Sequence, residues 1–305
     1  MTSLLTSLLT LLLPLFLLTA LGCALARTRL LAPSWQADLT ELTAKVFIPA
    51  LLFSGASKNG IPASMSWQTL AAFFIPLLLL FLAAAFGLRR QRAGAARALA
   101  ATYSNTVFVG IPVLARSFGP DSLQYAFPVI AFHSLVAFTL YYLAASHASG
   151  AAKLSASLWN VVSNPIVVSL MLGLACNGAG LAPAAPLAAV LALLAGAALP
   201  CALLALGASL ATFRVDHWLE TGATVAAKLL LLPACVLGMA LLAFGLPPAA
   251  TSVLVVIAAC PVGVNAAALV QADGEDAGVV SSAILLSSVL CMATLPFWIW
   301  IVSAL

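Results

Sequence analysis

Two apolar stretches of the sequence carry polar amides next to proline and glycine. Residues 101–114 read A-T-Y-S-N-T-V-F-V-G-I-P-V-L, and residues 257–271 read I-A-A-C-P-V-G-V-N-A-A-A-L-V-Q. Proline removes a backbone donor and glycine lets the chain unwind, so a helix is expected to break in each stretch. The free N–H groups at the start of each second half-helix would then attract an anion. The candidate substrate-binding residues at the two predicted breaks are Asn105, Thr106, Gly110, Ile111 and Pro112, and Pro261, Val262, Gly263 and Asn265.

The two predicted breaks indicate one binding site at the point where they cross. In lipid a broken turn persists only inside protein or beside a water-filled cavity. We expect half-helix ends at Gly110–Pro112 and Pro261–Gly263 to meet there, with Asn105 and Asn265 as neutral amide donors to a substrate. In the alternative, proline and glycine merely bend membrane helices, and the asparagines hydrogen-bond between helices.

Two ionisable side chains lie deep inside apolar segments. Lys228 lies about 17 Å from Asp216 along a continuous helix, near the middle of the membrane. It can balance a substrate carboxylate, replace a coupling sodium ion, snorkel to the inner face or cap a broken helix. His133 is a candidate proton carrier, although a lone histidine in a helix bundle is more often a neutral hydrogen-bonding residue. Gln271, which follows the second motif, joins these two as a candidate coupling residue.

The spacing of cysteine and histidine argues against an enzyme or a metal centre. The six cysteines stand singly in apolar runs without a CxxC pair. The three histidines, His133, His147 and His217, lack ligand spacing, and the acidic residues lie at or near the ends of apolar segments. We therefore expect no catalysis, no cofactor and no metal. The net charge of +4 is attributed to arginines in loops and not to nucleic-acid binding.

The composition places these motifs in an all-α membrane protein. Of the 305 residues, 64% are hydrophobic and 7% charged, whereas a soluble domain needs roughly 25% charged residues. Apolar segments of about 20 residues predict membrane-spanning helices with the lipid bilayer as their solvent. Ten such segments are Ser3–Ala26, Leu39–Ser57, Trp67–Leu88, Ala95–Phe118, Ser122–Ala148, Leu158–Asn177, Pro186–Leu210, Trp218–Leu246, Ala249–Ala272 and Ala277–Leu305.

Landmarks of the first half recur in the second half after about 150 residues. Five helices per repeat is an odd number, so the second repeat must be inverted relative to the first. We therefore predict two inverted five-helix repeats, residues 1–153 and 154–305, with broken, crossing helices 4 and 9. The matched landmarks are Pro14 with Pro165, Pro49–Ser57 with Pro200–Ser209, and Gly110–Pro112 with Cys260–Gly263.

Lysine and arginine in the short loops predict the orientation of the chain. With the N-terminus outside, the outer loops hold Lys58 and Arg116, and both termini then lie on the outer side. The tryptophans near the end of the last segment, Trp298 and Trp300, are typical of interfacial anchors. The inner loops hold the other loop cations, namely Arg27, Arg29, Arg89, Arg90, Arg92, Arg97, Lys153 and Arg214.

The paired motifs resemble those of the auxin efflux carrier family, which includes plant auxin exporters and bacterial organic-acid permeases. The Pro-x-Gly-x-Asn form is most similar to bacterial members linked to malonate and related dicarboxylates. The resemblance covers essentially the whole chain. It rests on Asn105–Leu114, Ala258–Asn265 with Gln271, Leu295–Pro296, Asn164–Pro165 and Pro200–Gly207.

This resemblance implies a scaffold domain of helices 1, 2, 6 and 7 and a moving transport domain of helices 3–5 and 8–10. It also implies elevator-type movement and a homodimer joined through the scaffold. The large cytoplasmic loop of the plant carriers is absent, because Ala148 to Leu158 is a short connection. Its absence argues against auxin as the substrate.

Together these observations predict a secondary active transporter in a bacterial inner membrane. The expected substrate is a small organic anion, such as a malonate- or malate-like carboxylate. The alternative is a sodium- or proton-coupled symporter of the bile-acid-carrier type for a larger organic anion. A membrane enzyme or a passive channel fits the residues less well, because no nucleophile with a base is apparent and broken helices are typical of carriers.

Overall fold

The structure, a computed structural model, describes residues 2–28, 30–32, 34–59, 66–86, 93–149, 163, 165–211, 217–272 and 275–305. Throughout these residues the chain is helical and forms no strand. One isolated antiparallel bridge joins Ser104 to Val262. The all-α prediction is confirmed for this part of the chain.

The N-terminal half forms helices close to the predicted apolar segments. The second segment is a single rod, in which the π-helical turn η1 joins α2 to α3. The fourth segment is instead split, because α5 ends before η2 and α6 begin. The elements are α1 (Thr2–Thr28), α2 (Trp35–Leu42), η1 (Thr43–Phe47), α3 (Ile48–Asn59), α4 (Trp67–Phe86), α5 (Ala93–Thr102), η2 (Thr106–Gly110), α6 (Ile111–Phe118), η3 (Pro120–Ser122) and α7 (Leu123–Ser149).

The C-terminal half likewise contains one split segment, which lies between two long helical rods. A single rod with two π-helical turns, η4 and η5, precedes a segment that is split into α13 and α14. The elements are α9 (Pro165–Gly178), α10 (Ala185–Leu210), α11 (Trp218–Ala226), η4 (Ala227–Leu231), α12 (Leu232–Gly238), η5 (Met239–Ala243), α13 (Pro248–Ala259), α14 (Asn265–Ala272) and α15 (Gly278–Val302).

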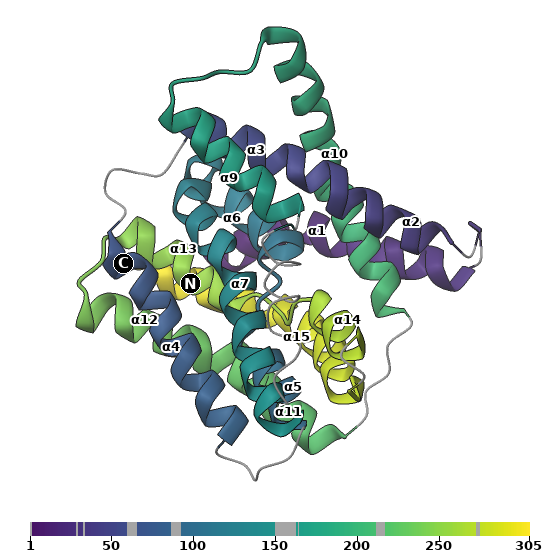
Figure 1. The fold of residues 1–305 in the computed structure, drawn as a ribbon, viewed down its shortest axis with the longest axis vertical. Helices are drawn as coiled ribbons and strands as arrows, with labels where there is room; N and C mark the ends of the chain where they lie inside the picture. The colour runs from purple at the N-terminus through teal and green to yellow at the C-terminus, as the bar shows by residue number, and fades with distance from the viewer. Residues whose placement is uncertain are drawn as a thin grey trace.

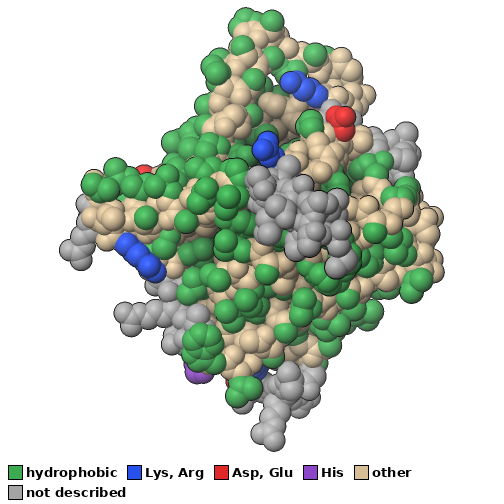
Figure 2. Space-filling view, turned by 180° about the vertical axis from the view of Figure 1, so that it is seen from behind, with side chains coloured by type: hydrophobic (Ala, Val, Ile, Leu, Met, Phe, Trp, Pro, Cys, Tyr) green, Lys and Arg blue, Asp and Glu red, His purple; other side chains and the backbone are tan. Residues whose placement is uncertain are grey.

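The described helices have the length and surface of a multi-pass membrane protein. Large apolar side chains such as Leu193 and Leu219 are exposed, and hydrophobic side chains cover much of the face in Figure 2. Such a surface is stable in lipid and not in water. Six helices are long and apolar enough to cross a bilayer: Trp35–Lys58, Trp67–Phe86, Pro120–Ala145, Ala185–Leu210, Trp218–Ala243 and Gly278–Val302.

The helices pack in two groups, which are visible as the upper and lower parts of Figure 1. In the first group α1 packs along α10, and α3 packs along α9 and α10. In the second group α4 packs on α5, α12 on α13, and both α11 and α13 on α15. Helices α1, α3, α6, α7, α10 and α15 provide contacts between the groups, so the broken segments lie next to the boundary.

Glycine allows the closest helix pair of the first group to form. A Cβ atom at Gly22 of α1 would overlap the carbonyl oxygen of Leu204 in α10. A Cβ atom at Gly207 of α10 would overlap the carbonyl oxygen of Thr19 in α1. Small residues permit this backbone approach, which provides the van der Waals contact that holds membrane helices together.

Candidate functional site

The two helix breaks lie against each other and share their backbone hydrogen bonds. The Asn105 N–H donates to the Pro261 carbonyl at 2.8 Å, and the Gly263 N–H donates to the Tyr103 carbonyl at 3.0 Å. Each break therefore supplies the carbonyl oxygen that accepts from a backbone N–H group of the other break. This arrangement meets the requirement that backbone groups within an apolar bundle be paired.

The first break lies earlier in the sequence than the proline motif suggested. Gly110 and Pro112 are inside the continuous helix η2–α6, so the predicted half-helix end at Gly110–Pro112 is wrong. The π-helical turn accounts for this difference, because the Ile111 N–H donates to the Thr106 carbonyl and the helix widens before the proline ring. The chain is instead interrupted at residues 103–105.

Asn105 begins the second half-helix of the first break. Its side-chain Oδ1 accepts a hydrogen bond of 3.2 Å from the Phe108 N–H, which caps the helix. Its own carbonyl accepts from the N–H groups of Val109 and Gly110. The Nδ2 atom of Asn105 is buried and has no hydrogen-bond partner among the described residues. Asn105 therefore both caps the helix and offers a free donor.

The second break lies at the predicted proline. Helix α13 ends at Ala259, and Pro261 and Gly263 lie in the interruption before α14. A Cβ atom at Gly263 would lie 2.6 Å from Cδ1 of the Tyr103 ring. Only glycine therefore fits at this point of contact between the breaks.

Each break also donates a backbone N–H group to a side chain of the long helix that follows it. The Ser104 N–H donates to Nε2 of His133 in α7 at 2.9 Å. The Val262 N–H donates to Oγ of Ser287 in α15 at 3.0 Å. Because a backbone N–H can only donate, Nε2 of His133 carries no proton here, and the ring is neutral with its proton on Nδ1. The ring stacks on Tyr103 with centroids 5.1 Å apart.

Lys228 caps the helix that ends at the second break. Its Nζ atom donates to the carbonyl oxygens of Ala258 and Cys260, at 2.5 Å and 2.7 Å. The C-terminal end of a helix favours a cation, and α13 ends at this point. Of the four roles that the sequence allowed, the geometry matches the cap of a broken helix. The side chain is fully buried.

Trp298 is part of this buried assembly, and its prediction as an interfacial anchor is wrong. The side chain is 5% exposed, and its indole N–H donates to the Leu229 carbonyl at 2.8 Å. Pro233 follows Leu229 by four residues and has no N–H to offer that carbonyl. The indole supplies the missing donor beside Lys228.

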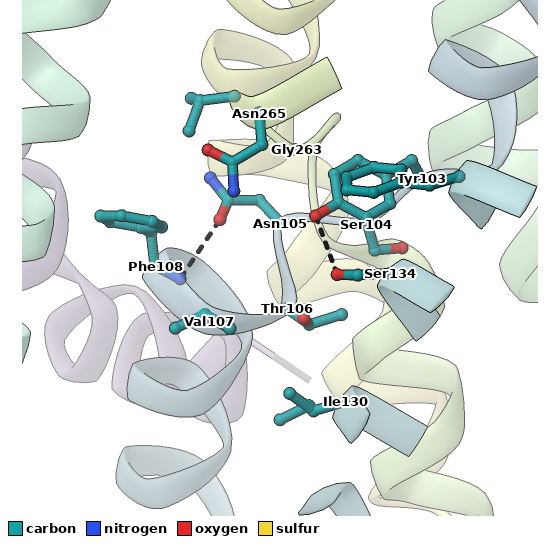
Figure 3. A pocket seen from close by; sticks show the side chains of 12 residues that line it. Tyr103, Ser104, Asn105, Thr106, Val107, Phe108, Ile130, Ser134, Gly263 and Asn265 are labelled. Atoms are coloured by element: carbon teal, nitrogen blue, oxygen red, sulfur yellow. Dashed lines mark hydrogen bonds between the residues drawn. The ribbon is translucent and has the colours of Figure 1, made fainter. Parts of the chain in front are cut away.

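A cavity of about 30 Å³ opens beside the two breaks, and Figure 3 shows it. The predicted residues Asn105, Thr106, Gly263 and Asn265 line it, and the two asparagine amides face each other. Its volume is enough for about two water molecules, so a larger molecule requires the walls to move apart. The remaining lining residues are Tyr103, Ser104, Val107, Phe108, Ile130, Ser134, Phe138 and Val264.

A second, apolar cavity on the boundary between the helix groups takes two other predicted residues. Pro112 and Pro261 line it, together with side chains of α1, α10 and α15. The predicted residues Gly110, Ile111 and Val262 are buried and line neither cavity. Gln271 lies in α14, and its side chain is outside the described part of the chain.

Sequence reasoning missed the hydroxyl groups of the first cavity. The Tyr103 hydroxyl lies 3.2 Å from Oγ of Ser134, which is on α7. Ser104 is 1% exposed, and its Oγ has no partner among the described residues. Tyr103 and Ser104 directly precede Asn105, so their position in a mid-helix run of polar residues was the available signal. No sequence pattern links Ser134 to the breaks.

An apolar bundle with two paired helix breaks beside a polar cavity has the features of a membrane transport protein. A family described as "Membrane transport protein" matches residues 7–157 and 152–299 of the chain. The chain therefore belongs to this family, the auxin efflux carrier family that its motifs resemble.

One curated relative is similar over much of the chain. It is an "uncharacterized transporter" of Methanothermobacter thermautotrophicus (strain Delta H), 34% identical over 204 residues. The match covers 66% of this chain and 65% of the relative, so it spans slightly less than two thirds of that protein. Family and relative together identify a membrane transport protein.

Proposed function

We propose that the chain is a secondary active transporter that moves a small organic anion by alternating access. The observation that carries this proposal is the meeting of Asn105 and Asn265, one from each break, in one cavity. Both residues stand at the start of a helix, where N–H groups and the helix dipole attract an anion. A malonate- or malate-like carboxylate fits this chemistry.

The proposed architecture is ten spans arranged as two inverted five-helix repeats, residues 1–153 and 154–305. In each half a broken segment is followed by a long helix that accepts a backbone N–H from the break. The family match also divides near this boundary, at residues 152–157. Equivalent breaks in inverted repeats are typical of substrate sites in secondary transporters.

The proposed movement is of the elevator type, with the second helix group sliding against the first. The scaffold would consist of α1, α2–α3, α9 and α10, and the transport domain of the remaining described helices. The tight glycine contacts of α1 with α10 suit a rigid scaffold. We further propose a homodimer in a bacterial inner membrane, with both termini outside, as the loop cations and the family resemblance suggest.

Lys228 supports a transporter that does not need a coupling sodium ion. Its ammonium group lies on the carbonyl oxygens of Ala258 and Cys260, which are the kind of ligands that a sodium ion would use. The alternative, a sodium- or proton-coupled carrier of the bile-acid type, would take a larger anion. At this volume either anion requires the cavity walls to move apart, and the smaller anion requires less movement.

Uptake of radiolabelled malonate, malate and succinate into proteoliposomes tests the proposal. Replacing Asn105 or Asn265 with alanine removes a donor and should lower uptake at least about tenfold, because hydrogen bonds to a charged ligand contribute about 1.5–3 kcal/mol. Asn177→Ala is the matched control, since this side chain donates to the Ser57 carbonyl between α9 and α3. Wild-type uptake by both site variants would refute the site, and uptake of no organic acid by the wild type would refute the function.

A further inference from the structure

The polar groups that line the first cavity are all uncharged. They are the hydroxyl groups of Tyr103, Ser104, Thr106 and Ser134 and the amides of Asn105 and Asn265, together with backbone groups. None of the twelve lining residues is an aspartate, glutamate, lysine, arginine or histidine. The lining itself therefore brings no full charge to a ligand.

Two of these groups are buried donors that still lack a partner. Asn105 is 4% exposed and its Nδ2 atom is unpaired among the described residues, as is Oγ of Ser104. A buried donor without a partner is unfavourable, so a ligand whose acceptor atoms reach these two groups gains affinity from them. Figure 3 shows the Asn105 amide beside that of Asn265.

The full charge next to the breaks comes from a single lysine. Lys228 is the only lysine, arginine, aspartate or glutamate in the described part of the chain that is buried as a whole residue. Its partners are carbonyl oxygens, and among the described residues no carboxylate pairs with it. His133 is neutral while it accepts from Ser104, and Arg97 pairs with Glu220 at 3.0 Å. Within the described part of the chain, the buried assembly thus has one basic side chain that has no carboxylate partner.

We infer that the site takes an organic anion with one negative charge, namely a monocarboxylate or the singly ionised form of a dicarboxylate. This inference rests on the proposed function and narrows its substrate class. One negative charge balances Lys228, and the neutral donors satisfy the carboxylate oxygens. A second charge would remain without a counter-charge, and burying an unpaired ion is strongly unfavourable.

The test compares three molecules of nearly equal size and different charge. Near neutral pH malonate has two negative charges, its monoamide malonamate has one, and malonamide has none. Competition with uptake of a labelled monocarboxylate, and thermal stabilisation of the purified full-length protein, report their relative affinities. We expect malonamate to bind at least about tenfold more tightly than either of the other two molecules. Malonate would bring an extra negative charge and malonamide would leave Lys228 without a counter-charge, and an unbalanced buried charge is unfavourable.

Two variants should shift the preferred charge in opposite directions. Ser134→Lys adds a cation to the lining and should move the preference toward malonate. Lys228→Met removes the buried cation and should move it toward malonamide. Thr28→Lys, at the exposed end of α1, adds the same charge away from the cavity and should leave the order unchanged. If one of these two site variants fails to fold, a shift of the preferred ligand charge in the other variant is enough to support the inference.

The possible outcomes separate the inference from the function on which it rests. Tighter binding of malonate than of malonamate by the wild type would overturn the single-charge inference and leave organic-anion transport intact. An unchanged order of affinities in a folded Ser134→Lys or Lys228→Met protein would also overturn it. If no mono- or dicarboxylate is bound or transported, the proposed function fails, and the inference fails with it.

Discussion

The two helix breaks are equivalent in their backbone and different in the side chains that hold them. Each donates one N–H group across the contact and one to the long helix that follows. At the first break the supporting groups are neutral, with the His133 ring held between Tyr103 and Phe73. At the second break the support is a lysine ammonium on the carbonyl oxygens of Ala258 and Cys260.

Because of this difference, the first break mainly determines the shape of the site and the second break its charge. The first break supplies half of the residues that line the cavity, including a capping asparagine, all without charge. The second break holds the cation and the glycine that lets the two segments touch. Two breaks with the same pattern of backbone hydrogen bonds can thus form a site with its charge at one break, because different buried side chains support them. Changes at the two breaks should therefore have different consequences.

The largest effect is expected where the breaks touch, at Gly263. In Gly263→Ala the new methyl group would lie 2.6 Å from Cδ1 of Tyr103, and the ring cannot retreat because it stacks on His133. Overpacking of this kind costs about 1–3 kcal/mol, and separation of the breaks should reduce uptake by at least about tenfold. Uptake in proteoliposomes and the thermal transition in detergent measure the two effects.

Gly238→Ala is the control for this prediction. A Cβ atom at Gly238 of α12 meets open space among the described residues, and alanine favours a helix. Its uptake should match that of the wild type, with equal or slightly higher stability. If both glycine variants behave alike, close contact between the breaks is not required for transport.

A smaller effect is expected from the neutral support of the first break. His133→Phe keeps a flat ring against Tyr103 and removes the acceptor for the Ser104 N–H. An unpaired buried N–H group costs about 1–3 kcal/mol, so the thermal transition should fall and uptake should decrease severalfold. His133→Gln offers a carbonyl oxygen to the same N–H and should restore most of both.

The glutamine variant also tests the proton-carrier hypothesis for His133. Glutamine can accept the hydrogen bond from Ser104, but it cannot carry a proton across the membrane. If His133 holds the break, His133→Gln transports and the pH dependence of uptake is unchanged. Loss of transport in a stable His133→Gln protein would instead support proton coupling, and the comparison of the two breaks would need revision.

The sequence predicted the apolar segments, the second break and three residues next to the breaks, Asn105, Asn265 and Lys228. These features depend on local composition, because proline, glycine and polar side chains are conspicuous in apolar runs. The first break was misplaced because a π-helical turn accommodates Pro112, and no sequence pattern distinguishes such a turn from a break. The roles of Ser134 and Trp298 depend on which helices pack together, and periodicity carries no information on that.

The smallest effect is expected at an ion pair near the rim of the second helix group. Arg97 of α5, the half-helix before the first break, pairs with Glu220 of α11, which continues into the turn that carries Lys228. The carboxylate of Glu220 is half exposed, so water and salt screen the pair, and it should contribute less than about 1 kcal/mol. In Arg97→Gln and Glu220→Gln, uptake should remain within about twofold of wild type, and their combination should be nearly additive.

A double-mutant cycle at low and high salt measures this coupling. A coupling free energy above about 1 kcal/mol would contradict this expectation. So would a loss of uptake comparable with that of His133→Phe, because it would mean that this ion pair and not the buried support determines how the breaks are held. The expected order of the His133 and ion-pair effects follows from burial. An exposed carboxylate is solvated by water when its partner is removed, whereas the buried N–H of Ser104 has no such substitute.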